Sequence, residues 1–219
     1  MIDVTHEINA VQRTVGSRVM NAGEARTVTL TRTYAGPVED VWDACTNPER
    51  IPRWFLPVSG ELHVGGRYQL EGNAGGTIER CDPPKSFSAT WEFGGEVSWI
   101  ELRLSPEAHG RTRFELLHIA HVDDTRWAEF GPGAVGVGWD LGLMSLAIHL
   151  ASGKSVDPRE VAAWNVSEEG KQFMSLSSQQ WCDASIKAGA DGVEAQAAAD
   201  RTTAAYTAAD PQASAASSA

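Results

Sequence analysis

The sequence predicts an α+β fold in which an antiparallel sheet packs against one long helix. Three observations predict it: a strand with two proline-capped helix starts over residues 31–57, short alternating segments over 65–120, and an apolar segment of helical length over 133–150. A sheet with one apolar face must be covered by another layer. The long helix is the segment that is able to cover it.

The first 25 residues form a weak lead-in to this fold. Apolar residues recur there every three to four positions, which favours one amphipathic helix or a turn. They are Ile8, Val11, Val15 and Val19. Ala25 to Tyr34 is rich in threonine, and Val28 and Leu30 alternate with Thr29 and Thr31, which predicts a strand.

Two helix starts follow that strand. Gly36-Pro37 predicts the first, because proline lacks the N–H that would have no partner in the first helical turn. Glu39 and Asp40 lie in that turn, where the helix dipole favours negative charge. Asn47-Pro48-Glu49 repeats the signal and predicts a second short helix that ends near Trp54-Phe55.

The middle of the chain predicts an antiparallel meander. Glycine and proline turn signals separate expected strands over residues 67–72, 77–81, 85–93, 96–104 and 111–120. In the last strand Phe114, Leu116 and His118 share one face. Trp99 has the opposite parity from Ile100, so we expect it on the outer face, where a C-terminal helix or a second subunit would have to cover it.

The long helix and a helical extension complete the chain. An inward stripe has the spacing of a core-facing helix. It comprises Trp139, Leu143, Leu146 and Leu150. Helix starts at Asp157-Pro158, Ser167 and Asp191 follow. We therefore expect a lead-in at 1–25, the sheet-and-helix domain at 26–151, a helical extension at 152–209 and a frayed tail at 210–219.

Composition argues against several classes of partner. The 219 residues are 42% hydrophobic and carry a net charge of −11. We expect a packed core, and neither a nucleic-acid nor a membrane partner, because an acidic surface repels phosphates. No apolar run approaches ~20 residues, and the N-terminus lacks the order of a signal peptide. Three distant cysteines, Cys45, Cys81 and Cys182, indicate neither a disulfide framework nor a zinc site, and favour a reduced, cytoplasmic protein.

One glycine motif suggests nucleotide chemistry that its context does not support. Residues 131–136 match G-x-G-x-x-G, and Asp157 follows Gly136 by 21 residues. A dinucleotide site would need a buried strand before the motif, yet Asp123–Phe130 is polar and is expected to be irregular. We interpret the segment as a flexible entrance loop with close helix packing and expect no cofactor.

Metal and catalytic sets are not expected either. His118 and His121 are three residues apart on a strand and face opposite sides, so they cannot both bind one metal ion unless the strand ends between them. No G-x-S-x-G occurs, and Glu79, Glu101 and Glu115 have the parity of exterior strand charges. We therefore assign no catalytic residue.

Short segments spread over about residues 26–151 match one family pattern by their order. They are Thr33–Trp42, Asn47–Trp54, Gly65-Gly66-Arg67-Tyr68, Cys81-Asp82-Pro83-Pro84, Thr90-Trp91, Thr112–His118, and Gly138-Trp139 with Leu143, Leu146 and Leu150. This order resembles the START/birch-pollen-allergen (SRPBCC) superfamily, and within it the family of the activator of the ninety-kilodalton heat-shock chaperone ATPase. The resemblance implies a helix-grip fold: a curved antiparallel sheet wrapped around a long helix, with a hydrophobic cavity between them.

The resemblance and the inward residues together predict binding of a small apolar or aromatic ligand in that cavity. The expected wall comprises Trp54, Phe55, Trp91, Phe114, Leu116, Trp139 and Leu143, with His118 as the orienting polar group and Gly131, Gly133 and Gly136 in the gate loop. The same aromatic residues also fit a filled core, and His118 fits a core histidine bonded to the backbone.

Two other functions stay open, because relatives in this superfamily bind ligands, act as co-chaperone domains or cyclise polyketides. One is a co-chaperone-like or homodimeric interaction module. The other is a polyketide-cyclase- or hydrolase-like enzyme, which requires at least two convergent polar groups in the cavity.

Overall fold

The chain forms two compact units in a computed structural model that describes residues 2–208. The sheet unit comprises Thr31–Ile119 and Gly142–Val156, and the extension unit comprises Met1–Leu30, Ala120–Leu141 and Asp157–Ala219. The boundaries fall within strand β2 and helix α4, so both elements contribute to each unit. The tail expected at 210–219 lies outside the described residues.

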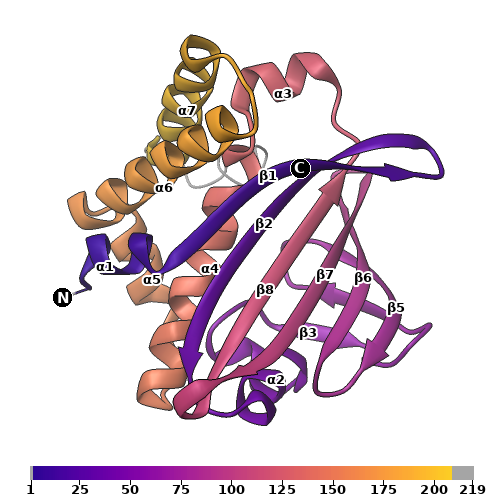
Figure 1. The fold of residues 1–219 in the computed structure, drawn as a ribbon. Helices are drawn as coiled ribbons and strands as arrows, with labels where there is room; N and C mark the ends of the chain where they lie inside the picture. Colours follow the sequence, from indigo (N-terminus) through magenta and orange to yellow (C-terminus); the bar gives the residue numbers. More distant parts are fainter. Residues whose placement is uncertain (1, 209–219) are drawn as a thin grey trace. The chain divides into compact units, whose positions relative to one another are not determined.

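Within the described residues, eight strands form one sheet in the order β1-β2-β8-β7-β6-β5-β4-β3 (Figure 1). Their bounds are β1 Val11–Met20, β2 Gly23–Ala35, β3 Val58–Gly60, β4 Arg67–Leu70, β5 Gly75–Asp82, β6 Ser86–Phe93, β7 Glu96–Glu107 and β8 Arg111–Ala120. A single turn, η2 (Ala108–Gly110), joins the last two strands. The pairs from β3 to β7 are antiparallel. The predicted meander and the α+β class are confirmed.

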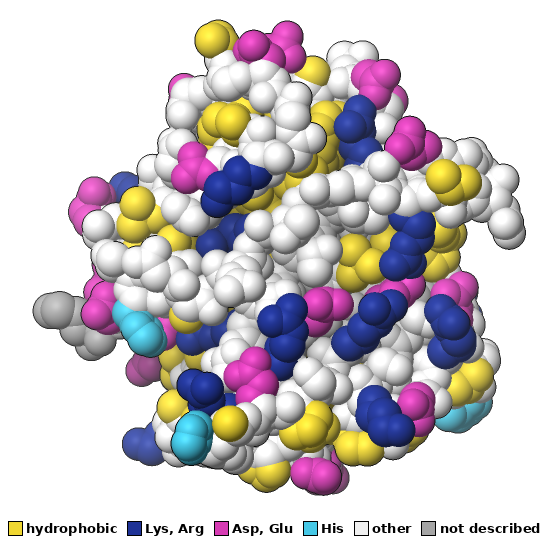
Figure 2. All heavy atoms as spheres, in the orientation of Figure 1, with side chains coloured by type: hydrophobic (Ala, Val, Ile, Leu, Met, Phe, Trp, Pro, Cys, Tyr) yellow, Lys and Arg dark blue, Asp and Glu magenta, His cyan; other side chains and the backbone are white. Residues whose placement is uncertain are grey.

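The two faces of β7 and β8 differ as their alternation predicts. Leu102 and Phe114 are 2% and 3% exposed. The intervening positions are charged, and Arg103 Nη2 lies 2.9 Å from a carboxylate oxygen of Glu101. Figure 2 shows basic and acidic side chains next to one another over these strands. The apolar face is therefore the inner face, and the charged face is solvated.

Two helical segments follow β2 in the sheet unit. Helix α2 (Val38–Thr46) confirms the first start signal, with Pro37 as its N-cap. The second signal produces only one 3-10 turn, η1 (Ile51–Arg53), in which Pro52 lacks a backbone donor. The C-terminal half of α4 belongs to the same unit, and Tyr34 Oη donates to the carbonyl of Leu143 at 3.0 Å.

The N-terminal segment differs from its prediction. It forms a short helix, α1 (Val4–Asn9), and then the strand β1, where one helix or a turn was expected. The reason is that Val11, Val15 and Val19 are spaced by four residues. Because four is an even number, these residues share one face of a strand as well as one face of a helix.

A second difference lies before the glycine motif. Residues expected to be irregular form helix α3 (Asp124–Phe130). The Asp123 carboxylate caps it by accepting the backbone N–H of Arg126 at 2.9 Å. An acidic N-cap is an ordinary helix start, but the segment between cap and glycine is only seven residues long, so periodicity could not show it.

The three start signals of the C-terminal third are confirmed. Helices α5 (Pro158–Asn165), α6 (Glu168–Lys187) and α7 (Gly192–Thr207) begin directly after the N-caps Asp157, Ser167 and Asp191. In the extension unit α7 packs along α6 and also against α3 (Figure 1). The extension is thus a packed helical layer.

The glycine motif forms a helix-packing surface, where an entrance loop was expected. Gly131 ends α3 with a φ of 59°, and both Gly133 and Gly136 lie within α4 (Gly133–Ser152). A Cβ on Gly136 would lie 2.2 Å from the Trp181 ring, and one on Gly133 would lie 3.1 Å from Thr202. The loop prediction is wrong for Gly133 and Gly136, because their missing side chains let α6 and α7 approach the backbone of α4.

Helix α4 also corrects the statement that no apolar run approaches 20 residues. It is 20 residues long and, by length and composition alone, apolar enough to cross a membrane, with 44% of its apolar window buried in the protein. The core helix of a globular protein passes the same test. The helix also contains two polar residues, Asp140 and His149, and both are buried in the protein, at 1% exposed.

Candidate functional site

The sheet unit contains seven of the eight residues expected to hold a ligand. The buried ones, each at most 5% exposed, are Phe114, Leu116, His118 and Leu143. The half-buried ones are Trp54, Phe55 and Trp91. The eighth, Trp139, is half-buried and belongs to the extension unit.

One cluster joins the sheet to the C-terminal half of α4. The ring of Tyr34 meets that of Phe114 edge-to-face, with centroids 5.7 Å apart and an interplanar angle of 88°. The same tyrosine donates its hydroxyl to the Leu143 carbonyl. Two predicted wall residues, from β8 and α4, are therefore connected through a third aromatic that the sequence did not single out.

A second cluster lies after η1. Trp54 and Phe55 stack with ring centroids 5.3 Å apart. The indole Nε1 of Trp54 donates to the carbonyl of Ala44 at 2.9 Å, which fixes this pair to α2. A Cβ on Gly142 would lie 3.6 Å from the Phe55 ring, so Phe55 packs directly on α4.

The third group is a row across three strands. His118 Nε2 lies 2.9 Å from Ser98 Oγ, and that hydroxyl donates to the carbonyl of Trp91 at 3.0 Å. A carbonyl can only accept, so in this arrangement the histidine Nε2 carries the proton and donates to Ser98. The Trp91 and His118 rings lie 6.4 Å apart. Burial lowers the pKa of His118 to about 4, so the imidazole is neutral near pH 7.

Hydrogen bonds and ion pairs of Arg50 connect α2, the start of η1 and the end of α4. The Arg50 guanidinium donates to Asp40 at 2.7 Å and to Asp43 at 3.0 Å. These bonds hold the pKa of Asp43 below its ordinary value. A further guanidinium nitrogen lies 3.4 Å from His149 Nε2, and the other ring nitrogen lies 2.8 Å from the Lys154 carbonyl. The Lys154 carbonyl must accept, so His149 Nδ1 carries a proton and Nε2 accepts from Arg50.

Three inner-face polar residues were missed by sequence reasoning. They are Tyr34, Ser98 and Arg32, whose guanidinium lies 5.2 Å from the Tyr34 ring and which is 6% exposed. Alternation along the strands could have identified two of them. Ser98 alternates with Ile100 on β7, and Arg32 alternates with Leu30 and Tyr34 on β2.

The extension unit has its own buried ion pair. Arg13 of β1 binds Asp140 of α4 through two nitrogens, each 2.9 Å from a carboxylate oxygen, and both side chains are at most 2% exposed. Ser177 and Trp181 of α6 also donate to this carboxylate, at 2.6 and 3.0 Å. Burial raises the pKa of Asp140, and these three donors oppose that rise.

The described residues hold no group of three histidine, cysteine, aspartate or glutamate side chains that could bind a metal ion. His118 and His121 have different neighbours: the first contacts Ser98, and the second lies 3.3 Å from the carbonyl of Glu24.

Comparison with known proteins places this arrangement in a family. The family model described as "Activator of Hsp90 ATPase homolog 1-like protein" matches residues 35–151, more than half of the chain. No curated protein sequence matches the chain.

Solved structures extend the likeness. CalU16 from Micromonospora echinospora is 35% identical; its crystal structure covers 80% of this chain and 98% of its own, with a TM-score of 0.65. Its solution structure, also at 35% identity, covers 82% and 97% with a TM-score of 0.67. Each CalU16 structure covers a larger part of this chain than the family model does, so the likeness to CalU16 reaches beyond residues 35–151.

Two further structures share the fold. MLL2253 from Mesorhizobium loti is 25% identical and covers 57% of this chain and 97% of its own, with a TM-score of 0.51. DynU16, described as a protein in the dynemicin biosynthetic locus, is 21% identical and covers 59% of this chain and 48% of its own, with a TM-score of 0.50. The family match, the CalU16 likeness and the sheet with its long helix agree: this chain belongs to the family of activator of Hsp90 ATPase homolog 1-like proteins, within the SRPBCC superfamily.

Proposed function

We propose that the protein binds a small apolar or aromatic molecule between the inner face of its sheet and the C-terminal half of α4. The row formed by His118, Ser98 and Trp91 carries this proposal. It puts one neutral polar ring beside an indole on a face that is otherwise largely apolar. Small-molecule sites have this composition: apolar walls and a few placed polar groups. The chain also belongs to the SRPBCC superfamily, whose helix-grip fold implies a hydrophobic cavity at this place, and this supports the same function.

The state of His118 limits the class of ligand. A neutral imidazole can orient a ligand through a hydrogen bond without adding a charge to the site. Protonation near pH 7 would require the charged ring to be buried, and its lowered pKa opposes this. Beside His118 we therefore favour an uncharged part of the ligand, with an apolar or aromatic body and one polar substituent.

The test compares two tryptophans on opposite faces of the sheet. Trp91 lies on the inner face, and Trp99, paired with Thr90 across β6 and β7, lies on the outer face. Native mass spectrometry of protein from its own host would first identify any bound small molecule. Titration with a neutral fluorescent naphthalene probe would then be carried out on the wild type and on Trp91→Leu, His118→Ala and Trp99→Leu.

We expect Trp91→Leu and His118→Ala to weaken probe binding several-fold and Trp99→Leu to leave it unchanged. The proposal is abandoned if all three variants bind the probe like the wild type, or if Trp99→Leu is the variant that loses binding.

The enzyme alternative has a specific obstacle. A serine–histidine pair does occur, at 2.9 Å, but a nucleophilic serine must give its proton to the histidine. Here the Ser98 hydroxyl donates to the Trp91 carbonyl, and the histidine donates to the serine. The pair suits ligand positioning better than nucleophilic catalysis.

The interaction-module alternative draws on the name of the matching family, which refers to a chaperone ATPase activator. Its structural candidate is the outer face around the half-buried Trp99. Light scattering of the wild type and of Trp99→Ser tests the homodimer version. A loss of dimer in the variant would favour it, and a monomeric wild type would remove it.

A further inference from the structure

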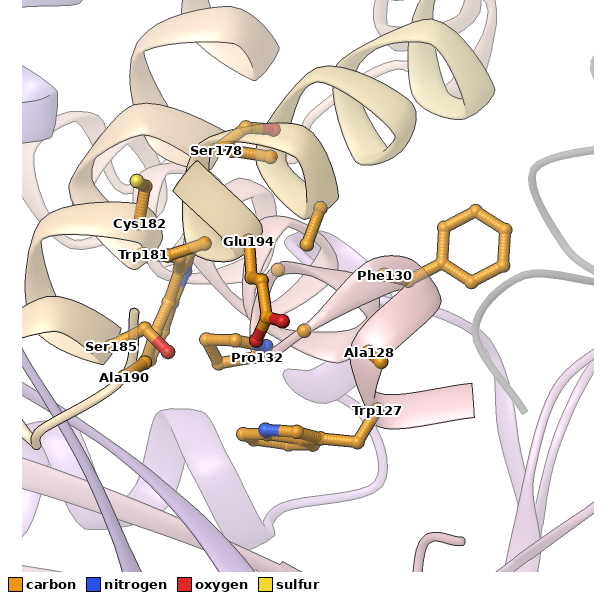
Figure 3. Close-up of a pocket in the computed structure, with 15 residues that line it drawn as sticks. Trp127, Ala128, Phe130, Pro132, Ser178, Trp181, Cys182, Ser185, Ala190 and Glu194 are labelled. Atoms are coloured by element: carbon orange, nitrogen blue, oxygen red, sulfur yellow. The ribbon is translucent and has the colours of Figure 1, made fainter. Parts of the chain in front are cut away.

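We infer that the extension unit contains a second binding site, for a small organic ammonium ion, in the pocket between α3, the start of α4 and helices α6 and α7. The pocket has a volume of about 110 Å³. Figure 3 shows the Glu194 side chain reaching from α7 towards Pro132, over the plane of the Trp127 indole. This site shares no residue with the ligand site proposed above.

The walls of the pocket are held in place by bonds outside it. On one side Trp181 donates its indole N–H to the buried Asp140 at 3.0 Å and packs over Gly136. The indole N–H of Trp181 is therefore used by Asp140, and the carbon atoms of Trp181 are left to line the pocket. A wall whose position is already fixed loses little conformational freedom when a ligand binds.

Helix α7 is anchored on the junction of α3 and α4. Thr202 donates its hydroxyl to the Phe130 carbonyl at 2.8 Å, and Tyr206 donates to the Ala134 carbonyl at 2.8 Å. The Arg201 guanidinium donates to the carbonyls of Glu129 and Ala128 at 2.6 and 2.9 Å. The helix that supplies Glu194 therefore cannot move away from the opposite wall without breaking several bonds.

Glu194 supplies the charge of the site. Among the described lining residues it is the one acidic or basic side chain, and the others are mainly alanine, glycine, proline and aromatic residues. It occupies the third position of α7, where a glutamate often bonds back to the N–H of the capping residue. In the described part of the chain its carboxylate makes no such bond and no ion pair. A carboxylate beside apolar walls favours a cation over an anion.

Trp127 supplies the second recognition element. The Arg26 guanidinium lies 4.6 Å from its ring centroid, so this indole already takes part in a cation–π contact. Arg26 does not line the pocket, and its charge is balanced by Asp124 at 2.6 Å. The ring is therefore held from outside, and its electron-rich surface towards the pocket suits an ammonium group. The net charge of −11 adds a general attraction for cations.

The volume sets the size of the ligand. Pockets for drug-sized molecules measure roughly 300–1,000 Å³. A pocket of about 110 Å³ accepts a few carbon atoms around one charged nitrogen, such as a quaternary ammonium group. Aromatic surfaces recognise such groups through the ring quadrupole, and the carboxylate would complete the charge balance.

The test uses tetramethylammonium as the probe, titrated into the full chain and followed by calorimetry and by NMR of the indole N–H signals. Two ligands control for charge and shape: sodium chloride at equal ionic strength, and tert-butanol as a neutral molecule of similar shape. We expect saturable binding of tetramethylammonium at millimolar concentration, with signal changes at Trp127, and no saturation with either control.

A matched pair of variants tests the carboxylate. Glu194→Gln removes the charge in the pocket, whereas Glu160→Gln removes a charge from the same third position of another helix, α5, away from the pocket. Glu194 is an exposed side chain. We expect Glu194→Gln to weaken binding about two- to fivefold, the range of an exposed ion pair, and Glu160→Gln to leave it unchanged.

Two results would overturn the inference. One is equal binding of tetramethylammonium and tert-butanol by the wild type, which needs no variant and would mean that the pocket selects shape alone. The other is equal affinity in Glu194→Gln and Glu160→Gln, which would make Glu194 an ordinary solvated charge.

Discussion

Replacing Asp140 by asparagine is expected to destabilise the extension unit by about 3 kcal/mol, because it leaves the buried Arg13 guanidinium without a counter-charge. The carboxylate of Asp140 accepts two bonds from Arg13 and one each from Ser177 and Trp181. An asparagine keeps the shape and one acceptor oxygen, but its NH₂ group faces a donor of Arg13.

The magnitude follows from the partners that remain. Breaking a buried ion pair by removing one partner costs about 3–5 kcal/mol. Arg13 Nη1 still donates to the carbonyls of Ile8 and Val11, at 3.1 and 3.0 Å, so part of the guanidinium stays satisfied. We therefore expect the lower end of the range. For a chain of this size that corresponds to a fall in Tm of roughly 6–12 °C.

Urea unfolding followed by far-UV circular dichroism measures the loss. Asp124→Asn is the matched control, because Asp124 and Arg26 form an exposed pair of similar length, at 2.6 Å, in the same unit. Exposed pairs contribute about 0–1 kcal/mol. If Asp140→Asn were no more destabilising than Asp124→Asn, the reasoning that the buried charge needs its partner would be refuted.

Two further predictions concern α4 and the sheet. Gly136→Ala is expected to destabilise by about 1–3 kcal/mol because its methyl would overlap Trp181, whereas Gly142→Ala, 3.6 Å from Phe55, is expected to stabilise by up to about 1 kcal/mol; effects of the same sign in urea unfolding would contradict this. The second prediction concerns pH. The pKa of His118 in the folded protein, about 4, lies below its ordinary 6.5, so the unfolded chain takes up a proton first as the pH falls. The stability that depends on a neutral His118 is therefore fully present above pH 6.5 and is lost as the pH falls towards 4. Between pH 7 and 4.5 the wild type should lose about 2 kcal/mol more than His118→Gln, and equal losses would show that the buried ring titrates normally.

The sequence predicted the elements of the sheet unit well because their signals are local. The turn signals from Gly65 to Gly110 separate strands whose alternation survives in the burial of β7 and β8. Helix caps such as Ser167 and Asp191 are also local, and both start helices. The N-terminal strand β1 could not be recognised, because a four-residue spacing is compatible with either a helix or a strand.

The polar partners could not be predicted because they are remote in sequence. Arg13 and Asp140 are 127 residues apart, and the Ser98 that fixes His118 is 20 residues away on a neighbouring strand. No periodicity connects such residues. His118 itself was predicted to face inward, since parity on a strand fixes a side even when the partner is unknown.

The glycines at the start of α4 also bear on how such a chain can be shortened or recombined. A fragment that ended after α4 would leave the surfaces at Gly133 and Gly136 without α6 and α7, and Asp140 without Ser177 and Trp181. Removing the N-terminal strand would take away Arg13 from the same carboxylate. Strand β1 and helices α6 and α7 therefore depend on one another through α4. We expect them to be transplanted to another protein successfully only together.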